Sequence, residues 1–285
     1  MHEKRAAGLR AWAFAIQASA EEVGFRMWRP FWGGQRLDRP IFMIGCPRSG
    51  TSISSQLFAL HPQIADLSEA GEVWDPSHYA DPEADHYWRA ADVTPRESAR
   101  LHDRFEFARR VRRRERFFNK HPRNSVRTEY LRVVFPDAYF IHVIRDGRPV
   151  VRSLLEMIER EPQRKAAPMG AFCKPPNWRE LLRDDPVEQA ALQWREIVRY
   201  VLDQRDALGD RYHEYRYEDL CADTRGVLGR AFAFAGLRTD QDVLRRLPET
   251  LPLRSQAWRQ AFSSSQIDTI ERVQAPLLRH LGYDV

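Results

Sequence analysis

The sequence predicts an α/β fold: a central parallel sheet with helices on both faces, arranged as a P-loop-like three-layer sandwich. Predicted strands and helices alternate along the chain, and charged or hydroxyl groups follow several strands at their carboxyl ends. Alternation of this kind is typical of a parallel sheet covered by helices, and such sheets bind ligands outside the carboxyl ends of their strands. The chain has 285 residues, 43% of them hydrophobic, which suffices for a large core. We expect one domain over 41–285, with a helical segment over 1–40 packed on it.

The first predicted strand covers 41–44 and leads into a glycine-containing loop and a helix. Gly45 and Gly50 bracket four residues as in a P-loop, so successive backbone N–H groups and the helix N-terminus can converge on an anion. The loop that binds nucleoside triphosphates has a lysine where Thr51 stands. Here the cation is Arg48, inside the loop. The backbone amides of the loop are therefore expected to hold one phosphate, and the positive charge of Arg48 is expected to point at a group attached to that phosphate.

A second anion-binding position is predicted at the end of the strand over 138–144. Arg145 follows this strand directly and offers a planar fork of donors to a phosphate. Ser153 lies eight residues further on, two turns into the next helix and on the side that faces back toward the strand end. The alternative is a local ion pair between Arg145 and Asp146, with Ser153 on the helix surface.

Together these segments resemble the sulfotransferases that use 3′-phosphoadenosine 5′-phosphosulfate (PAPS). The phosphosulfate loop of that family reads Pro-Lys/Arg-Ser-Gly-Thr after a strand, and an arginine at a later strand end with a serine eight residues on binds the 3′-phosphate. The resemblance implies PAPS as the cofactor, adenosine 3′,5′-bisphosphate (PAP) as its product, no metal, and in-line transfer of a sulfuryl group to a hydroxyl. The residues that it implies for nucleotide binding are Pro47, Arg48, Ser49, Gly50, Thr51, Ser52, Arg145, Ser153 and Tyr217.

Three positions are similar to the branch of the family that includes the tyrosylprotein sulfotransferases and many bacterial relatives. Glu69 matches the catalytic glutamate and is implied as the general base, with Glu72 as the alternative. Lys120 matches a lysine that assists the departing phosphate and would flank the bridging oxygen together with Arg48. Tyr217 matches the tyrosine of a Tyr-Glu-x-Leu strand end that contacts the nucleotide.

The chain departs from the family pattern in two places. His121 replaces the usual small or acidic residue beside Lys120, and it is the next candidate for a base if neither glutamate serves. The family's late serine near the sulfuryl group has no clear counterpart, although Ser255 is a candidate.

The remaining elements follow from local signals. Thr94 and Pro95 are typical of a helix start, and the charged helix that follows, to about residue 114, forms most of a helical insertion at about 79–115. Residues 66–79 are expected to be loop-like. The segment at about 161–186 is rich in proline and glycine, which predicts an ordered loop or a gating loop rather than a helix or strand. The other expected elements are strands over 116–120 and 213–217, helices over 124–135 and 187–208, a helix that ends near 236, and a C-terminal helix with a capping box at Ser263 and Gln266.

Charge and cysteine content restrict the partners. A net charge of +5 suits a ligand with several phosphates; it would also suit nucleic acid or an anionic membrane, but no nucleic-acid motif is present. Three cysteines and scattered histidines, without metal-ligand spacing, predict neither a disulfide framework nor a metal site. The apolar stretch over 11–20 is too short to span a bilayer and lacks a signal-cleavage pattern. We expect a cytoplasmic protein, with peripheral membrane contact through 9–32 as an alternative to packing of that segment on the domain.

The acceptor is not identified by these motifs. A hydroxyl on a small metabolite, a saccharide or a glycolipid is expected, and the oligomeric state is left open. A P-loop kinase of a small molecule is the alternative function, but Thr51 replaces the lysine that it needs. A membrane-surface binding module would leave Arg145, Ser153 and Lys120 unexplained.

Overall fold

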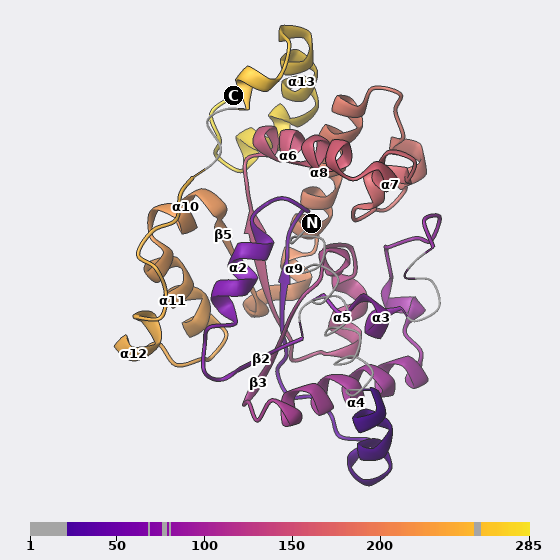
Figure 1. Cartoon of the computed structure of the whole chain (residues 1–285), viewed down its shortest axis with the longest axis vertical. Coiled ribbons are helices and arrows are strands. Elements are labelled where there is room, and N and C mark those ends of the chain that lie inside the picture. The colour runs from indigo at the N-terminus through magenta and orange to yellow at the C-terminus, as the bar shows by residue number, and fades with distance from the viewer. Residues whose placement is uncertain (1–21, 68, 76–78, 80, 254–257) are drawn as a thin grey trace, which may run out of the picture.

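A five-stranded parallel sheet in the order β2-β3-β1-β4-β5 forms the centre of the protein (Figure 1). The computed structural model describes residues 22–67, 69–75, 79, 81–253 and 258–285. Every neighbouring pair of strands is parallel. The strands are β1 (Ile41–Ile44), β2 (Ile64–Asp66), β3 (Arg116–Lys120), β4 (Tyr139–Ile144) and β5 (Tyr212–Arg216). The predicted parallel α/β fold is confirmed, and β2 is a strand that the sequence analysis did not predict.

Each face of the sheet is covered by its own hydrophobic core. Successive side chains of a strand point to opposite faces, so Phe42 belongs to one core and its neighbours Ile41 and Met43 to the other. The Phe42 side is covered by α4 (Pro95–Val111), α5 (Thr128–Val134), α6 (Gly147–Arg160), α8 (Pro186–Asp203) and α13 (Ser264–His280). The Met43 side is covered by α2 (Thr51–Phe58), α10 (Tyr217–Ala222), α11 (Thr224–Phe234) and α12 (Gln241–Leu244). Burial on both faces explains why β1 is apolar throughout.

Two predicted helix starts are confirmed by their caps. The Thr94 hydroxyl accepts a hydrogen bond from Glu97 N, with Pro95 in the first helical position of α4. At α13, Ser263 and Gln266 form both hydrogen bonds of the capping box. These contacts satisfy N–H groups that have no partner within the first helical turn.

Other predicted boundaries shift by small amounts. The helix expected over 124–135 begins instead with a 3₁₀ turn (Pro122–Val126), and α5 follows it. The helix expected over 187–208 divides into α8 and α9 (Arg205–Leu208). The loop-like region over 66–79 contains the single-turn helix α3 (Gly71–Trp74).

The segment at 161–186 was predicted to contain no element, and this was wrong. It holds α7 (Pro162–Lys165) and two 3₁₀ turns, Pro168–Ala171 and Trp178–Leu181. The first two begin at a proline, which is favoured at the first helical position. Lys174, 1% exposed, donates from Nζ to the Ala84 carbonyl at 2.8 Å, and Trp178 Nε1 donates to Asp85 at 2.7 Å. The segment is therefore packed against residues 81–86.

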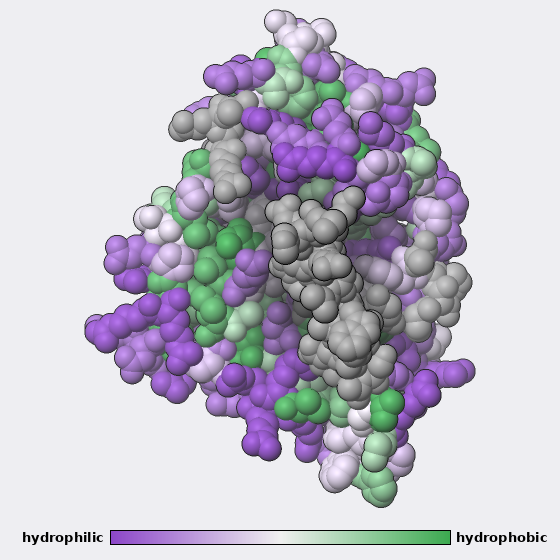
Figure 2. Space-filling model, viewed as in Figure 1, coloured by the Kyte–Doolittle hydropathy of each residue, from purple (hydrophilic) through white to green (hydrophobic). Residues whose placement is uncertain are grey.

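Residues 22–32 form a helix that contacts α4. The rings of Phe25 and Trp28 each lie 5.6 Å from the ring of Phe107. Val23, Met27 and Phe31 are exposed, by 59%, 70% and 77%. In Figure 2 the lower end of the molecule, where this helix lies in Figure 1, is white to green rather than purple. The rest of the segment for which membrane contact was predicted, 9–21, lies outside the described residues.

A pH-dependent stability follows from His142 in the core strand β4. Its Nδ1 lies 2.7 Å from the Tyr212 hydroxyl, which itself donates to Glu214, so Nδ1 carries the proton. Burial lowers the pKa of His142 to about 3, below its value in the unfolded chain, so its contribution is present above about pH 6.5 and is lost as pH falls toward 3.

The variant His142→Asn keeps a donor but cannot titrate. Between pH 6 and 4 we expect the unfolding free energy of the original protein to fall more steeply than that of the variant, by about 1.4 kcal/mol per pH unit. Urea unfolding at several pH values measures both slopes, with the exposed His280→Asn as the control. Equal slopes in the original protein and His142→Asn would contradict this assignment.

Candidate active site

The loop between β1 and α2 is held so closely that two positions have no space for a side chain. Gly45 has φ 154° and Gly50 has φ 88°. A Cβ at Gly45 would lie 2.6 Å from the Val143 carbonyl oxygen, and one at Gly50 would lie 2.1 Å from the Tyr217 ring. The loop therefore lies directly against the end of β4 and the start of α10, as a phosphate-binding turn requires.

A buried serine fixes the start of this loop. Ser125, in the turn that follows β3, donates from Oγ to the Gly45 carbonyl and accepts from Gly45 N, both at 2.8 Å. At the other end, Gly50 directly precedes α2, and its carbonyl accepts from Ser54 N at 3.0 Å. The backbone N–H groups of the first turn of α2 are thus left to face an anion.

The larger cavity at this edge of the sheet brings together most of the predicted nucleotide-binding residues. Its volume is about 660 Å³, which lies in the range of cofactor sites. Arg48 Nε donates to Ser153 Oγ at 2.9 Å, and Arg145 Nη1 donates to the Arg48 carbonyl at 3.0 Å. The Arg145 guanidinium lies 4.7 Å from the centre of the Tyr217 ring. The predicted residues that line this cavity are Arg48, Gly50, Thr51, Ser52, Arg145, Ser153 and Tyr217.

The electrostatics of this cavity fit an anionic group. Burial and then the charge of Arg145 lower the pKa of Arg48. Arg145 Nε and the hydroxyl of Ser49 are buried without a hydrogen-bond partner among the described residues. An unpartnered buried donor is costly. An anion in this cavity would satisfy Arg145, which lines it, whereas Ser49 is fully buried outside the cavity lining. The alternative interpretation, an ion pair between Arg145 and Asp146, is not observed; Asp146 pairs with Arg148 instead, at 2.8 Å.

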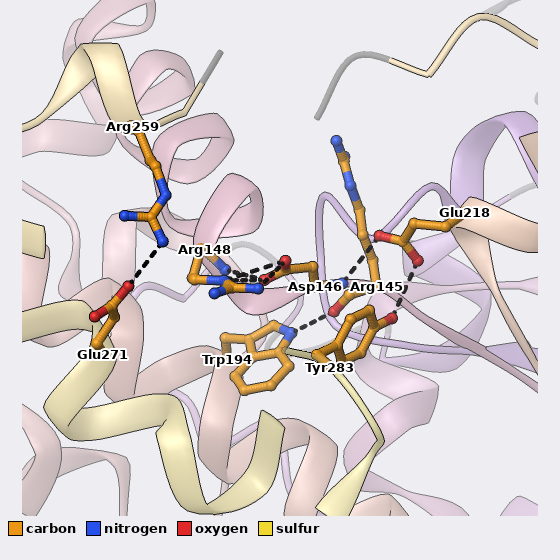
Figure 3. Close-up of polar contacts among 8 residues, drawn as sticks. All are labelled: Arg145, Asp146, Arg148, Trp194, Glu218, Arg259, Glu271 and Tyr283. Carbon is orange, nitrogen blue, oxygen red and sulfur yellow. Dashed lines mark hydrogen bonds and ion pairs between the residues drawn. The ribbon is translucent and has the colours of Figure 1, made fainter. Parts of the chain in front are cut away.

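A network behind Arg145 holds the end of β4 in place (Figure 3). Trp194 Nε1 donates to the Arg145 carbonyl at 3.2 Å. Glu218 accepts from Asp146 N at 3.2 Å and from the Tyr283 hydroxyl at 3.0 Å. Burial raises the pKa of Glu218. These three supporting residues were not predicted from the sequence. Glu218 could have been found beside Tyr217 in its motif, whereas Trp194 and Tyr283 carry no local signal.

A second cavity, of about 250 Å³, shares Arg48, Thr51 and Ser52 with the first. Its wall contains Pro47, Glu69, Lys120 and His121. Lys120, 5% exposed, forms an ion pair with Glu69, and its Nζ lies 3.4 Å from Ser52 Oγ. The structure therefore brings the three residues predicted to be catalytic, Arg48, Glu69 and Lys120, to the place where the two cavities meet.

The geometry of His121 does not suit a base. Its Nδ1 accepts from Arg123 N at 3.1 Å, so the proton of the neutral ring is on Nε2. Burial and then the charge of Arg127 lower the pKa of His121 well below its ordinary value. Neither nitrogen has a free lone pair for an acceptor proton.

Two predicted positions cannot be placed. Ser255 and the side chain of Glu72 lie outside the described residues, so the choice between Glu69 and Glu72 as the base stays a prediction. Within the described ranges, no three His, Cys, Asp or Glu side chains lie close enough together to hold a metal ion. No helix of that part of the chain is long and apolar enough to cross a membrane.

The fold and the two cavities define an α/β protein with a P-loop-like anion site. Residues 40–241 match the model of the sulfotransferase family, and the chain belongs to that family, as its motifs predicted. Over 174 residues the chain is 31% identical to the omega-hydroxy-beta-dihydromenaquinone-9 sulfotransferases Stf3 of Mycobacterium bovis and Mycobacterium tuberculosis. These matches cover 60% of this chain and 42% of each relative, so the chain spans less than half the length of these curated relatives.

Solved structures share the fold. The sulfotransferase STF9 from Mycobacterium avium has a TM-score of 0.58 and 17% identity, over 88% of this chain and 79% of that protein. The sulfotransferase domain of the Synechococcus PCC 7002 olefin synthase has a TM-score of 0.55 and 21% identity, over 88% of this chain and 98% of that domain. At these identities the likeness supports the predicted fold class.

The contact between Ser125 and Gly45 gives a testable consequence. Ser125→Ala leaves a buried N–H and a buried carbonyl of the loop unpaired, so we expect the unfolding free energy to fall by about 1–3 kcal/mol. Urea unfolding measures it. Ser264→Ala, at an exposed site in the first turn of α13, should change stability by less than about 0.5 kcal/mol. Similar values for both variants would show that Ser125 does not anchor the loop.

Proposed function

We propose that this protein transfers a sulfuryl group from PAPS to a hydroxyl of a small-molecule acceptor by in-line displacement. The observation that supports this most is the shared wall of the two cavities, formed by Arg48, Thr51 and Ser52. A group attached to a phosphate in the loop would point from the larger cavity toward Glu69 and Lys120. Donor and acceptor would then meet at this wall.

The larger cavity would bind the nucleotide. The amides of the loop and of the first turn of α2 would hold the 5′-phosphate, and Arg145 and Ser153 would hold the 3′-phosphate. The Tyr217 ring lies beside both the loop and Arg145. PAPS supplies the activated sulfuryl group, and these residues bind and orient it.

The smaller cavity would bind the acceptor. Glu69 would accept the proton of the acceptor hydroxyl as its oxygen bonds to sulfur and the bond from sulfur to the bridging oxygen breaks. Lys120 and Arg48 would stabilise the charge that develops on the phosphate oxygen that leaves. Because the protein forms no covalent bond in this scheme, orientation and fixed charge supply the catalysis.

Two observations suggest the class of the acceptor: the substrate in the name of the curated relatives and the volume of the smaller cavity. The curated relatives are named as sulfotransferases of omega-hydroxy-beta-dihydromenaquinone-9, which is a small molecule. A cavity of about 250 Å³ suits part of such a molecule. A small metabolite is therefore the first candidate, with a saccharide or glycolipid as alternatives. We also propose a cytoplasmic location, with the exposed apolar side chains of helix 22–32 available for contact with a membrane surface.

A small-molecule kinase is the alternative, since such a loop also suits phosphates of ATP. The two functions are separated by supplying sulfur-labelled PAPS, or ATP with magnesium, to a panel of hydroxylated acceptors. Transfer of the sulfur label supports our proposal. Transfer only from ATP would refute it.

The role of Glu69 is tested by Glu69→Gln, which preserves the shape of the side chain but removes its proton affinity. We expect kcat to fall by about 10²–10⁴-fold, the usual contribution of a positioned base, while PAP affinity stays unchanged. Glu72→Gln is the matched comparison under the same label-transfer assay. Normal turnover in Glu69→Gln together with an inactive Glu72→Gln would assign the base to Glu72.

A further inference from the structure

The smaller cavity has hydrogen-bond donors that nothing satisfies. His121, 2% exposed, has an Nε2 without a partner, and Nη1 of Arg123 is also buried and unpartnered in the described part of the chain. Both residues line the cavity. Since the proton of His121 is on Nε2, both nitrogens are donors, and a ligand that satisfies them must present lone pairs.

Arg123 differs from the other cations of this cavity in having no assigned anion. Lys120 pairs with Glu69, and Arg164 pairs with Glu161 at 2.7 Å. Arg48 lies within the phosphate loop, where it donates to Ser153 Oγ and is proposed to face the nucleotide. Arg123 instead donates from Nη2 to the Tyr79 carbonyl at 2.9 Å and lies 4.5 Å from the centre of that ring. It forms no ion pair with a described carboxylate.

The surroundings of Arg123 add positive charge. Arg127 is fully buried, with Nε bonded to the His86 carbonyl at 2.9 Å and both Nη atoms without partners among the described residues. Burial lowers the pKa of Arg127 to about 9, so it remains charged at neutral pH. The nearby carboxylate of Asp75 favours the charged form of both arginines and raises the pKa of each, against the larger effect of burial. Buried charge without a partner is costly, which points to an anion supplied from outside the chain.

We propose that the acceptor is a hydroxy acid, whose carboxylate binds Arg123 and the Nε2–H of His121 while its hydroxyl faces Glu69. The inference rests on the proposed function, because it places the acceptor in the smaller cavity. A carboxylate accepts hydrogen bonds at both oxygens and donates none, which matches a wall of donors. An amide of the same shape offers one acceptor and no charge.

The test measures binding to the protein saturated with PAP, so that the phosphate loop is already occupied. Titration calorimetry compares 4-hydroxyphenylacetate with 4-hydroxyphenylacetamide, and 3-hydroxybutyrate with 3-hydroxybutyramide. We expect the acid of at least one pair to bind about 10-fold or more tightly than its amide, as expected for hydrogen bonds to a charged group. Equal affinities within both pairs, or no binding of either acid, would overturn the proposal.

Variants then test whether Arg123 causes the preference for the acid over the amide. Arg123→Gln should remove this preference, and Arg123→Lys should keep part of it. Arg179→Gln, which removes an exposed arginine paired with Asp85, is the control and should keep all of it. A preference that survives in Arg123→Gln would refute the role of Arg123. If Arg123→Gln does not fold, the acid and amide comparison in the original protein decides alone. Failure of PAP itself to bind would instead refute the proposed function.

Discussion

The site depends on how closely the backbone after β1 approaches its neighbours. Without side chains at Gly45 and Gly50, the loop lies against the Val143 carbonyl and the Tyr217 ring, and this approach brings the ends of β1, β4 and β5 together around one cavity. Arg48 adopts φ 71° within the loop, a conformation uncommon outside glycine. Strain of this kind persists where the surrounding structure holds it, here through the bonds of Arg48 to Ser153 and Arg145.

The turn after β3 connects the two cavities. Lys120 ends the strand, the next residue, His121, caps the turn through Arg123 N, and Ser125 within that turn holds Gly45. This short segment thus positions three features: the Lys120 cation near the expected leaving group, the His121 donor in the smaller cavity, and, through Ser125, the start of the phosphate loop. His121 therefore has two roles that do not require it to act as a base: it caps the turn that holds the phosphate loop, and it lines the smaller cavity.

The features that could be predicted from sequence are those set by local patterns. β1 and β3 were predicted at their observed bounds because their ends are marked by clear changes in polarity, and the caps at Thr94 and Ser263 are local hydrogen bonds. β2 was missed because three residues give too short a pattern. Trp194 and Tyr283 reach the site only through tertiary packing, and the proton position on His121 depends on a contact that no sequence pattern specifies.

The central claim is that one cavity holds two separate phosphates of a nucleotide. It is tested most directly by comparing the Kd of PAP with that of AMP, which lacks the 3′-phosphate, by titration calorimetry. The account predicts that PAP binds at least about 10-fold more tightly, since Arg145 and Ser153 would add charge-assisted hydrogen bonds. Arg145→Ala should reduce this preference to near unity, while the exposed Arg132→Ala should preserve it. Equal Kd values for PAP and AMP in the original protein would contradict the account.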